Sequence, residues 1–277
     1  MKLNYLLNEG YKDNSIFYDR GIGPYIYKNK KKFLDLSSAG GTLLLGYNHN
    51  NFKNSIKMFD KLNYANFAAP NKFANEFSKS IKKVLPQFDK FILCNSGAEA
   101  NIKALRICRA VTKKNLIVLI SGSWHGSVDQ LLFKLENNNK ISNISDGIDP
   151  IIKKNVIVIP YNNYEESVKI LKKNINKICC VILEPIQGCL PDGKSINYLK
   201  KINKYCKKNH LIFLLDEIIS GLRFKNGSLQ KLINIHSDIS TFGKSFGAGM
   251  PLGFIGVSKK IVKIIKINKL NIFYGGT

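Results

Sequence analysis

A single lysine, Lys244, stands among small and aromatic residues in the stretch from Ser240 to Pro251. Three glycines, Gly243, Gly247 and Gly249, lie close to it and allow the backbone to turn sharply, so that a bulky ligand can approach. A lysine held near an apolar wall has a lowered pKa and can attack a carbonyl carbon. Lys244 is therefore a candidate Schiff-base residue, with a surface lysine in a glycine-rich loop as the alternative.

Two acidic residues follow apolar runs that have the character of buried strands. Glu184 comes directly after residues 179–183, and Asp216 comes directly after residues 211–215. A carboxylate at such a position is costly unless it meets a donor or a cation. An acid beside a ring nitrogen would keep that nitrogen protonated, and we expect this function for Asp216. For Glu184, a structural salt bridge and a catalytic role both remain open.

A small-residue segment from Asn95 to Ala100 follows another apolar run. Ser96 and Glu99 within it have the spacing of a capping box, which predicts the start of a helix. The free N–H groups of such a helix start suit a phosphate group, although an ordinary capped helix has the same sequence pattern.

The single tryptophan, Trp124, stands beside His125 just after the apolar run 116–120. An aromatic ring at the end of a strand can stack on a planar ligand. A place in the core is the alternative for Trp124 taken alone.

One cofactor, pyridoxal phosphate, requires all these groups together. Its phosphate needs a cradle, its planar ring an aromatic face, its pyridine nitrogen an acid, and its aldehyde a lysine. The cofactor acts as an electron sink once a substrate amine has replaced the lysine. The released Lys244 then stays poised to move the substrate's α-proton.

The histidines show no metal-ligand spacing, and we expect no metal.

The elements that must position these residues alternate between strand and helix from residue 90 onward. Helical stretches, such as residues 98–111 and 198–208, separate several of the apolar runs. The runs are short, rich in β-branched residues and apolar on both faces, which is typical of a covered parallel sheet. They comprise residues 91–94, 116–120, 156–159, 179–183 and 211–215. This pattern predicts an α/β fold with ligands at the carboxyl ends of the strands.

The first third of the chain has a different pattern. Residues 1–50 form a separate small element in which segments 24–27 and 32–36 alternate as in a β-hairpin. Residues 51–85 carry two helical patterns, and Pro86 closes the second.

The bulk composition narrows the choice of partners and compartment. The formal charge is +24, but only four of the 43 basic residues are arginines, the usual readers of nucleic acid bases. We therefore expect solvated lysine-rich faces and no nucleic acid partner. The six cysteines lack CxxC spacing, which favours buried free thiols in a reducing compartment. Without a signal-peptide pattern or an apolar run of about 20 residues, we expect a cytoplasmic protein that does not enter membranes.

In order and spacing, the motifs resemble those of the class III pyridoxal-phosphate aminotransferases, over nearly the whole chain. The matching segments are residues 95–100, 124–126, 184–188, 215–223 and 241–253. The resemblance implies fold type I, with a large domain built on a mostly parallel sheet of the seven-stranded type flanked by helices. Residues 1–50 would be the N-terminal segment of the small domain, and residues 51–277 the cofactor-binding large domain. Family members continue past the position of Thr277, so a C-terminal small domain is expected to be missing here.

The resemblance also implies a role for each matching residue. Lys244 would form the imine with the cofactor aldehyde, and Asp216 would bind the pyridine nitrogen. Thr277 would reach the phosphate of the neighbouring subunit's cofactor, which implies a homodimer with shared sites. The other expected cofactor contacts are Ser96, Gly97 and Ala98 at the phosphate, Trp124 and Ile218 on the two ring faces, and His125 and Glu184 nearby.

Within this family the chain looks closest to the glutamate-1-semialdehyde 2,1-aminomutases, which form the tetrapyrrole precursor 5-aminolevulinate. Ile219 is apolar, as in aminomutases, where ornithine- and GABA-type members usually carry glutamine. The expected substrate is thus a small amino acid or amino-aldehyde. A transaminase acting on another amine and a keto acid is one alternative, and an inactive truncated homologue or a polyanion-binding protein is another.

Overall fold

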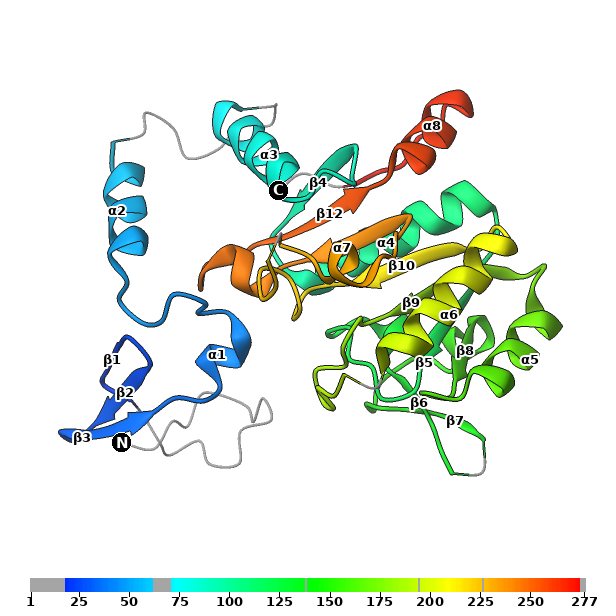
Figure 1. Cartoon of the computed structure of the whole chain (residues 1–277), viewed down its shortest axis with the longest axis horizontal. Coiled ribbons are helices and arrows are strands. Elements are labelled where there is room, and N and C mark those ends of the chain that lie inside the picture. Colours follow the sequence, from blue (N-terminus) through cyan, green and yellow to red (C-terminus); the bar gives the residue numbers. More distant parts are fainter. Residues whose placement is uncertain (1–17, 62–70, 138, 194, 226, 275–277) are drawn as a thin grey trace. The chain divides into compact units, whose positions relative to one another are not determined.

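A computed structural model describes residues 18–61, 71–137, 139–193, 195–225 and 227–274 of the chain (Figure 1). The chain divides into two compact units, Met1–Ala65 and Asn66–Thr277, which we describe separately. Helix α2 (Asn50–Phe59) thus groups with the N-terminal unit. The division into domains at residue 50 remains a prediction.

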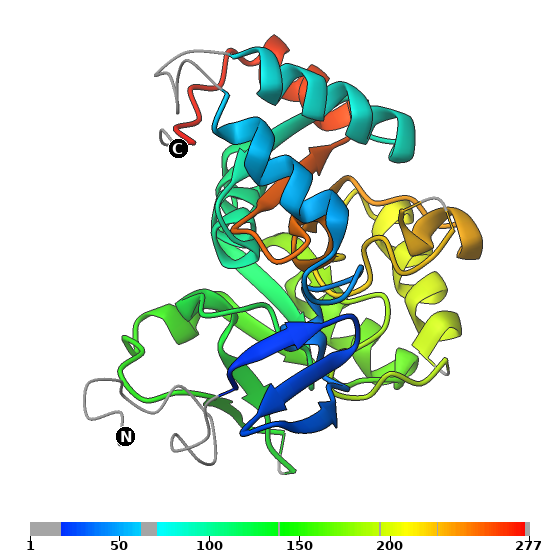
Figure 2. The same cartoon turned by 90° about the vertical axis from the view of Figure 1, so that its left-hand side faces the viewer.

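The N-terminal unit contains a small antiparallel sheet. Its strands, β1 (Arg20–Ile22), β2 (Tyr25–Lys28) and β3 (Lys31–Leu34), lie side by side in that order and are dark blue in Figure 2. The hairpin prediction is confirmed for β2 and β3, whereas β1 was not predicted. Asn29 and Lys30 connect β2 to β3 with φ angles of 47° and 64°, a left-handed pair that matches the twist of a two-residue hairpin.

The second unit is built on a seven-stranded sheet in the order β4-β12-β11-β10-β9-β5-β8. Strand β12 is antiparallel to both of its neighbours, and the other six strands all run in one direction. The expected mostly parallel α/β sheet is therefore confirmed. The strands are β4 (Lys90–Cys94), β5 (Leu116–Ile120), β8 (Val156–Ile159), β9 (Ile178–Leu183), β10 (Ile212–Asp216), β11 (Ile239–Phe242) and β12 (Gly253–Val257).

Two details of the sheet differ from the sequence-based expectation. Asp216 is the last residue of β10 rather than the first residue after it, because the strand is shifted by one position. Strands β11 and β12 were not predicted. Ser240 and Thr241 make β11 partly polar, and Gly253 and Gly256 interrupt the apolar pattern of β12, so that neither segment shows the continuous apolar run of the other strands.

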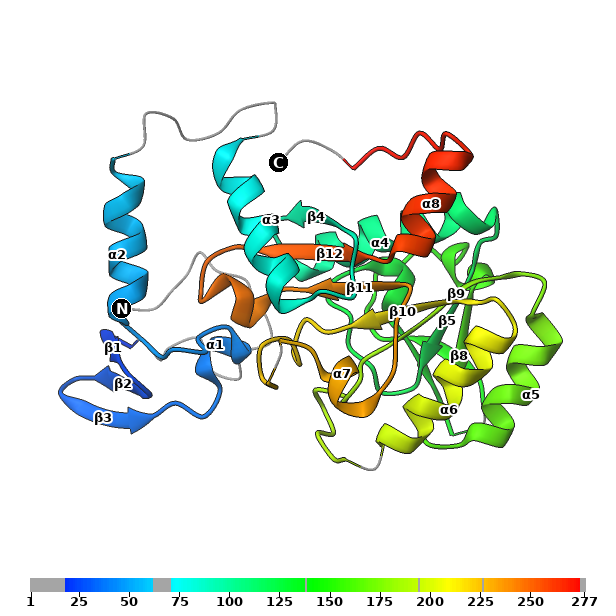
Figure 3. The ribbon, with the colours of Figure 1, turned by 45° about the horizontal axis from the view of Figure 1, so that its top comes forward.

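Helices cover both faces of this sheet, as Figure 3 shows. Helices α4 (Gly97–Thr112) and α8 (Lys259–Ile267) pack on one face, in a core cluster that includes Leu105 and Ile261. Helices α5 (Tyr164–Asn174) and α6 (Ser195–Lys208) pack on the other, in a cluster that includes Leu171 and Ile202. The helices expected over residues 98–111 and 198–208 are thereby confirmed as α4 and α6.

An aromatic cluster packs against β4, β12 and β11 at one side of the sheet. Helix α3 (Lys72–Val84) contributes Ile81 to it and ends two residues before Pro86, as expected. Phe242 and Phe254 stack in this cluster with ring centroids 4.9 Å apart. The remaining elements are α1 (Ser38–Gly41), η1 (Asp129–Leu131), β6 (Phe133–Leu135), β7 (Ile141–Asn143), η2 (Ile152–Asn155), α7 (Leu229–Ile233) and η3 (Lys244–Gly247).

The structure also bears on the expectations about membrane-spanning segments and about the cysteines. Among the described residues, no helix has both the length and the apolar character needed to cross a bilayer. All six cysteines are free, and every one except Cys189 is buried, as the sequence predicts.

Candidate active site

The candidate residues of the second unit follow the carboxyl ends of five strands. Because β4, β5, β9, β10 and β11 all run in one direction, these ends meet at the same edge of the sheet. The residues placed at this edge are Ser96 after β4, Trp124 and His125 after β5, Glu184 after β9, Asp216 at the end of β10, and Lys244 after β11.

Asp216 is 3% exposed, and its carboxylate is held by three donors. Its Oδ2 atom lies 2.7 Å from Nδ1 of His125 and accepts a hydrogen bond of 3.0 Å from Nδ2 of Asn101. Its Oδ1 atom accepts the backbone N–H of Ile218 at 3.0 Å. Three donors on one carboxylate restrict its orientation. The structure thus brings Asp216 and His125 together, and it fixes the position of the acid.

Asn101 is a site residue that the sequence analysis missed. It is fully buried on α4, and Nδ2 also donates to the backbone carbonyl oxygen of His125 at 2.9 Å. One amide group therefore ties the end of β10 to the loop after β5. The available signal was a polar residue between Ala100 and Ala104 on the apolar face of the helix, where a buried amide needs partners.

The start of α4 is capped as its sequence predicts. Ser96 is the N-cap residue, and its Oγ accepts the backbone N–H of Glu99 at 3.1 Å. The Glu99 carboxylate accepts the backbone N–H of Asn95 at 2.7 Å and pairs with Lys103 at 2.5 Å. The first turn therefore has a rigid shape, with the positive end of the helix dipole at the site edge.

Two glycines allow other parts of the chain to approach this helix start closely. A Cβ atom on Gly97 would lie 2.6 Å from Cδ1 of Ile218, and a Cβ atom on Gly253 would overlap the backbone carbonyl of Ser96. Ile218 thus packs against the start of α4, and its backbone N–H is one of the donors to Asp216. The approach of Gly126 to Ala98 is less close, since a Cβ atom on Gly126 would lie 3.1 Å from that of Ala98.

Lys244 follows β11 after one residue, Gly243, and begins the short helix η3. Its φ angle of 45° is in the left-handed region, which is strained for a residue with a side chain. Burial lowers the pKa of Lys244, and the negative charges of Asp216 and Glu184 oppose this shift. The amine is therefore half-buried within electrostatic reach of both carboxylates, which is the environment of a nucleophilic lysine.

Glu184 is held by backbone N–H groups and not by the salt bridge that the sequence analysis considered. Its two oxygens accept the backbone N–H groups of Trp124 at 3.0 Å and of Gly188 at 3.2 Å. Among the described residues it forms no ion pair with a lysine or arginine. Burial raises the pKa of its carboxyl group. Glu184 therefore holds the loop after β5 against the turn after β9.

The remaining candidates have different surroundings. Trp124 is 49% exposed, so the alternative of a core residue is wrong for it. Cys189, at the same edge, donates its thiol to the carbonyl oxygen of Gly122 at 2.9 Å. Gln187 is buried and donates to the carbonyl oxygen of Ser121 at 2.8 Å. Thr277 lies outside the described residues.

Comparison with protein families gives one clear match. The family model for aminotransferase class-III matches residues 6–277. Among curated proteins, glutamate-1-semialdehyde 2,1-aminomutase of Wigglesworthia glossinidia brevipalpis is 34% identical over 262 residues, which are 91% of this chain and 59% of that protein. The aminomutase of Methanococcus maripaludis is 32% identical over 253 residues, covering 89% and 58%.

Solved structures with the same fold include several transaminases. An omega-transaminase from Sphaerobacter thermophilus superposes with a TM-score of 0.84 at 19% identity, covering 94% of this chain and 61% of that one. A glutamate-1-semialdehyde aminomutase from Pseudomonas aeruginosa PAO1 gives 0.79 at 14% identity, covering 94% and 57%. The chain spans about three-fifths of the length of these relatives. On the match of the family model, the chain belongs to the class III aminotransferases.

Proposed function

We propose that this chain binds pyridoxal phosphate and moves an amino group within a small amino-aldehyde, as a glutamate-1-semialdehyde 2,1-aminomutase. The observation that carries the proposal is the joint position of Asp216, His125 and Lys244 at one edge of the sheet, with Asp216 buried and held by three donors. The aminomutases among the curated relatives support the choice of reaction within the family.

The residues present fit the ring nitrogen and the phosphate of the cofactor. The buried Asp216 carboxylate suits a protonated ring nitrogen, because its three donors hold it in one orientation and leave it able to accept a further hydrogen bond. The capped start of α4, with Gly97 and Ala98 in its first turn, suits a phosphate group. Trp124 and Ile218 would contact the two faces of the ring. When bound, pyridoxal phosphate supplies an aldehyde that captures amines and a ring that accepts electrons.

The chain's own residues have distinct tasks in this proposal. Lys244, with its lowered pKa, would hold the cofactor through its amine and, once a substrate amine has replaced it, would remove the substrate's α-proton. His125 and Asn101 keep Asp216 oriented, so that its charge is in place before the substrate arrives. The Glu184 carboxylate accepts the backbone N–H of Trp124 and so would hold the loop after β5 in position. Ile219, adjacent to Ile218, would contribute an apolar wall towards the substrate.

The assembly and location are part of the same proposal. A homodimer would let Thr277 of each subunit reach the cofactor phosphate of the other, and the set of free thiols fits a cytoplasmic location. A mixture of Lys244→Ala and Thr277→Ala chains tests the shared site. If the two substitutions affect different halves of each site, mixed dimers regain part of the activity that both parents lack.

A turnover assay with and without an external amino acceptor tests the proposed reaction. An aminomutase converts glutamate-1-semialdehyde to 5-aminolevulinate without any keto acid, since the amino group returns to the same molecule. Strict dependence on an added keto acid would instead identify a transaminase, and binding of cofactor without turnover of any amine would identify an inactive homologue.

A further inference from the structure

A cavity lies at the amino-terminal ends of strands β5 and β8, away from the candidate active site. It has a volume of about 240 Å³ and is lined by residues of α4, β5, η1, η2 and β8. Ile117 of β5 and Val156 of β8 are register partners at the beginning of the β5–β8 pairing and lie at this cavity. The active-site residues follow the other end of β5, so the cavity is a separate site.

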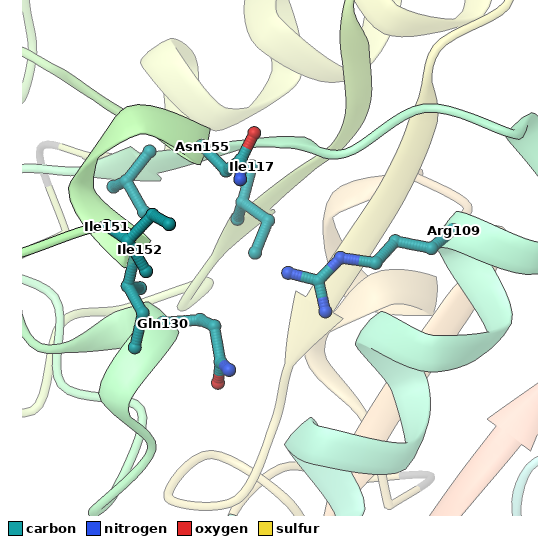
Figure 4. A pocket seen from close by; sticks show the side chains of 7 residues that line it. Arg109, Ile117, Gln130, Ile151, Ile152 and Asn155 are labelled. Carbon is teal, nitrogen blue, oxygen red and sulfur yellow. The ribbon is translucent and has the colours of Figure 1, made fainter. Parts of the chain in front are cut away.

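Arg109 is the charged group of this cavity. It comes from the last turn of α4, and Figure 4 shows its guanidinium pointing from the helix into the pocket. Within the part of the chain that the structure describes, no carboxylate pairs with this guanidinium, and the buried thiol of Cys179 lies within its electrostatic reach. A half-buried guanidinium with five N–H donors and an apolar floor is a strong binder of anions.

The opposite wall adds two neutral amides and an aliphatic surface. The side chains of Gln130 and Asn155 line the cavity, and each carries an NH₂ group that can donate to an oxygen. Ile151 and Ile152 complete this wall, and Ile151 is 59% exposed. The site thus combines one positive charge, two amide groups and a branched apolar lining.

We propose that this cavity binds a small monocarboxylate with a branched aliphatic body. A single guanidinium binds a carboxylate through two parallel N–H···O bonds and balances one negative charge, which leaves a doubly charged phosphate under-compensated. The isoleucines bury the aliphatic part of the ligand. The cavity is smaller than the roughly 300–1,000 Å³ typical of pockets for drug-sized ligands, so the ligand is small. The proposal does not depend on the reaction at the active site.

Calorimetric titration of the full chain with isovalerate tests the site. Three probes distinguish the chemistry: isovalerate, the uncharged isovaleramide of the same shape, and inorganic phosphate. We expect saturable binding of one isovalerate per chain, with isovaleramide and phosphate each at least about ten-fold weaker, since neither can form the charge-balanced pair with the guanidinium. Tighter binding of phosphate than of isovalerate would overturn the assignment.

Two arginines on the same helix provide a matched pair of variants. Arg109→Met keeps the length of the side chain but removes the charge, and it should weaken isovalerate binding at least ten-fold. Arg106→Met should leave the affinity within two-fold, because Arg106 is exposed and donates to the carbonyl oxygen of Phe273 instead. Equal affinity in wild type and Arg109→Met would contradict the proposal, since the ligand would then bind elsewhere.

Circular dichroism shows whether Arg109→Met is folded. If it is not, Gln130→Met and Asn155→Leu test the opposite wall, and each should weaken binding by about three- to ten-fold through the loss of one neutral hydrogen bond. Absence of saturable binding to the wild-type chain, or unchanged affinity in both of these variants, overturns the proposal regardless of Arg109.

Discussion

The Oδ2 atom of Asp216 lies 2.7 Å from Nδ1 of His125, and both side chains are buried. The contact joins the end of β10 to the loop after β5, although β9 lies between these strands in the sheet. Because the Asp216 carboxylate accepts hydrogen bonds, Nδ1 of His125 donates the proton. This geometry fixes the imidazole orientation and holds the negative charge at the site edge.

Replacing Asp216 by asparagine should remove the charge while keeping the shape of the side chain. We expect Asp216→Asn to lower turnover by at least about 100-fold, in line with the loss of a preorganised charge at a reacting group. Turnover at saturating cofactor is the measurement. Asp238→Asn is the matched control, since Asp238 accepts the backbone N–H of Phe213 and pairs with Lys260 away from the site. Similar losses in both variants would mean that Asp216 has only a structural role.

Asn101 should affect both the site and stability. Asn101→Leu leaves the carbonyl oxygen of His125 unsatisfied and removes one donor from Asp216, at a cost of about 1–3 kcal/mol. Asn203→Leu removes a comparable bond from a buried helical asparagine to the carbonyl oxygen of His236, which precedes β11 and so lies at the other end of that strand from the site.

Thermal melting and cofactor titration separate the two effects of these variants. Both should lower the melting temperature, but only Asn101→Leu should weaken cofactor affinity, by about ten-fold. Unchanged cofactor affinity in a folded Asn101→Leu chain would remove Asn101 from the site.

Gly253 should be intolerant of any side chain. A Cβ atom there would overlap the backbone of Ser96, and backbone cannot move aside as a flexible side chain can. Gly253→Ala should therefore cost about 1–3 kcal/mol of stability and displace the start of α4, which weakens cofactor binding. Gly193→Ala has open space around the added methyl group and should change neither quantity. Urea denaturation and cofactor titration of both variants check this expectation.

Glu217, the neighbour of Asp216, should give a pH-dependent stability effect. It is fully buried, and Ser228, Leu229 and Gln230 all donate to its carboxylate. Burial nevertheless raises its pKa above the ordinary value of 4.5. The unfolded chain then loses this proton first as the pH rises. Between 4.5 and the raised pKa, the folded state binds more protons, so the free energy of unfolding contributed by Glu217 falls with rising pH.

The Glu217→Gln variant cannot titrate at this position, and it should gain stability relative to the wild type as the pH rises from 4.5 towards neutrality. The gain amounts to about 1.4 kcal/mol for each unit by which the folded-state pKa is raised. Urea denaturation of both proteins at several pH values measures it. A stability difference that stays constant with pH would show that the pKa of Glu217 is not raised in the folded chain.

The strands and their site residues were predictable because the driving forces are local. Continuous apolar runs such as residues 116–120 can only be buried strands or helices, and a carboxylate or lysine at their ends stands out. The order of strands in the sheet and the reversed direction of β12 depend on long-range packing that no local pattern encodes. Asn101 was missed for the same reason, since its partners Asp216 and His125 are distant in sequence.

The most direct test of the proposed function is to locate the attachment point of the cofactor. The purified chain is incubated with pyridoxal phosphate, reduced with borohydride, digested and mapped by mass spectrometry. We expect one reduced cofactor on the peptide containing Lys244, and none at this peptide in the Lys244→Ala variant. Labelling scattered over many lysines, with no preference for Lys244, would contradict the account.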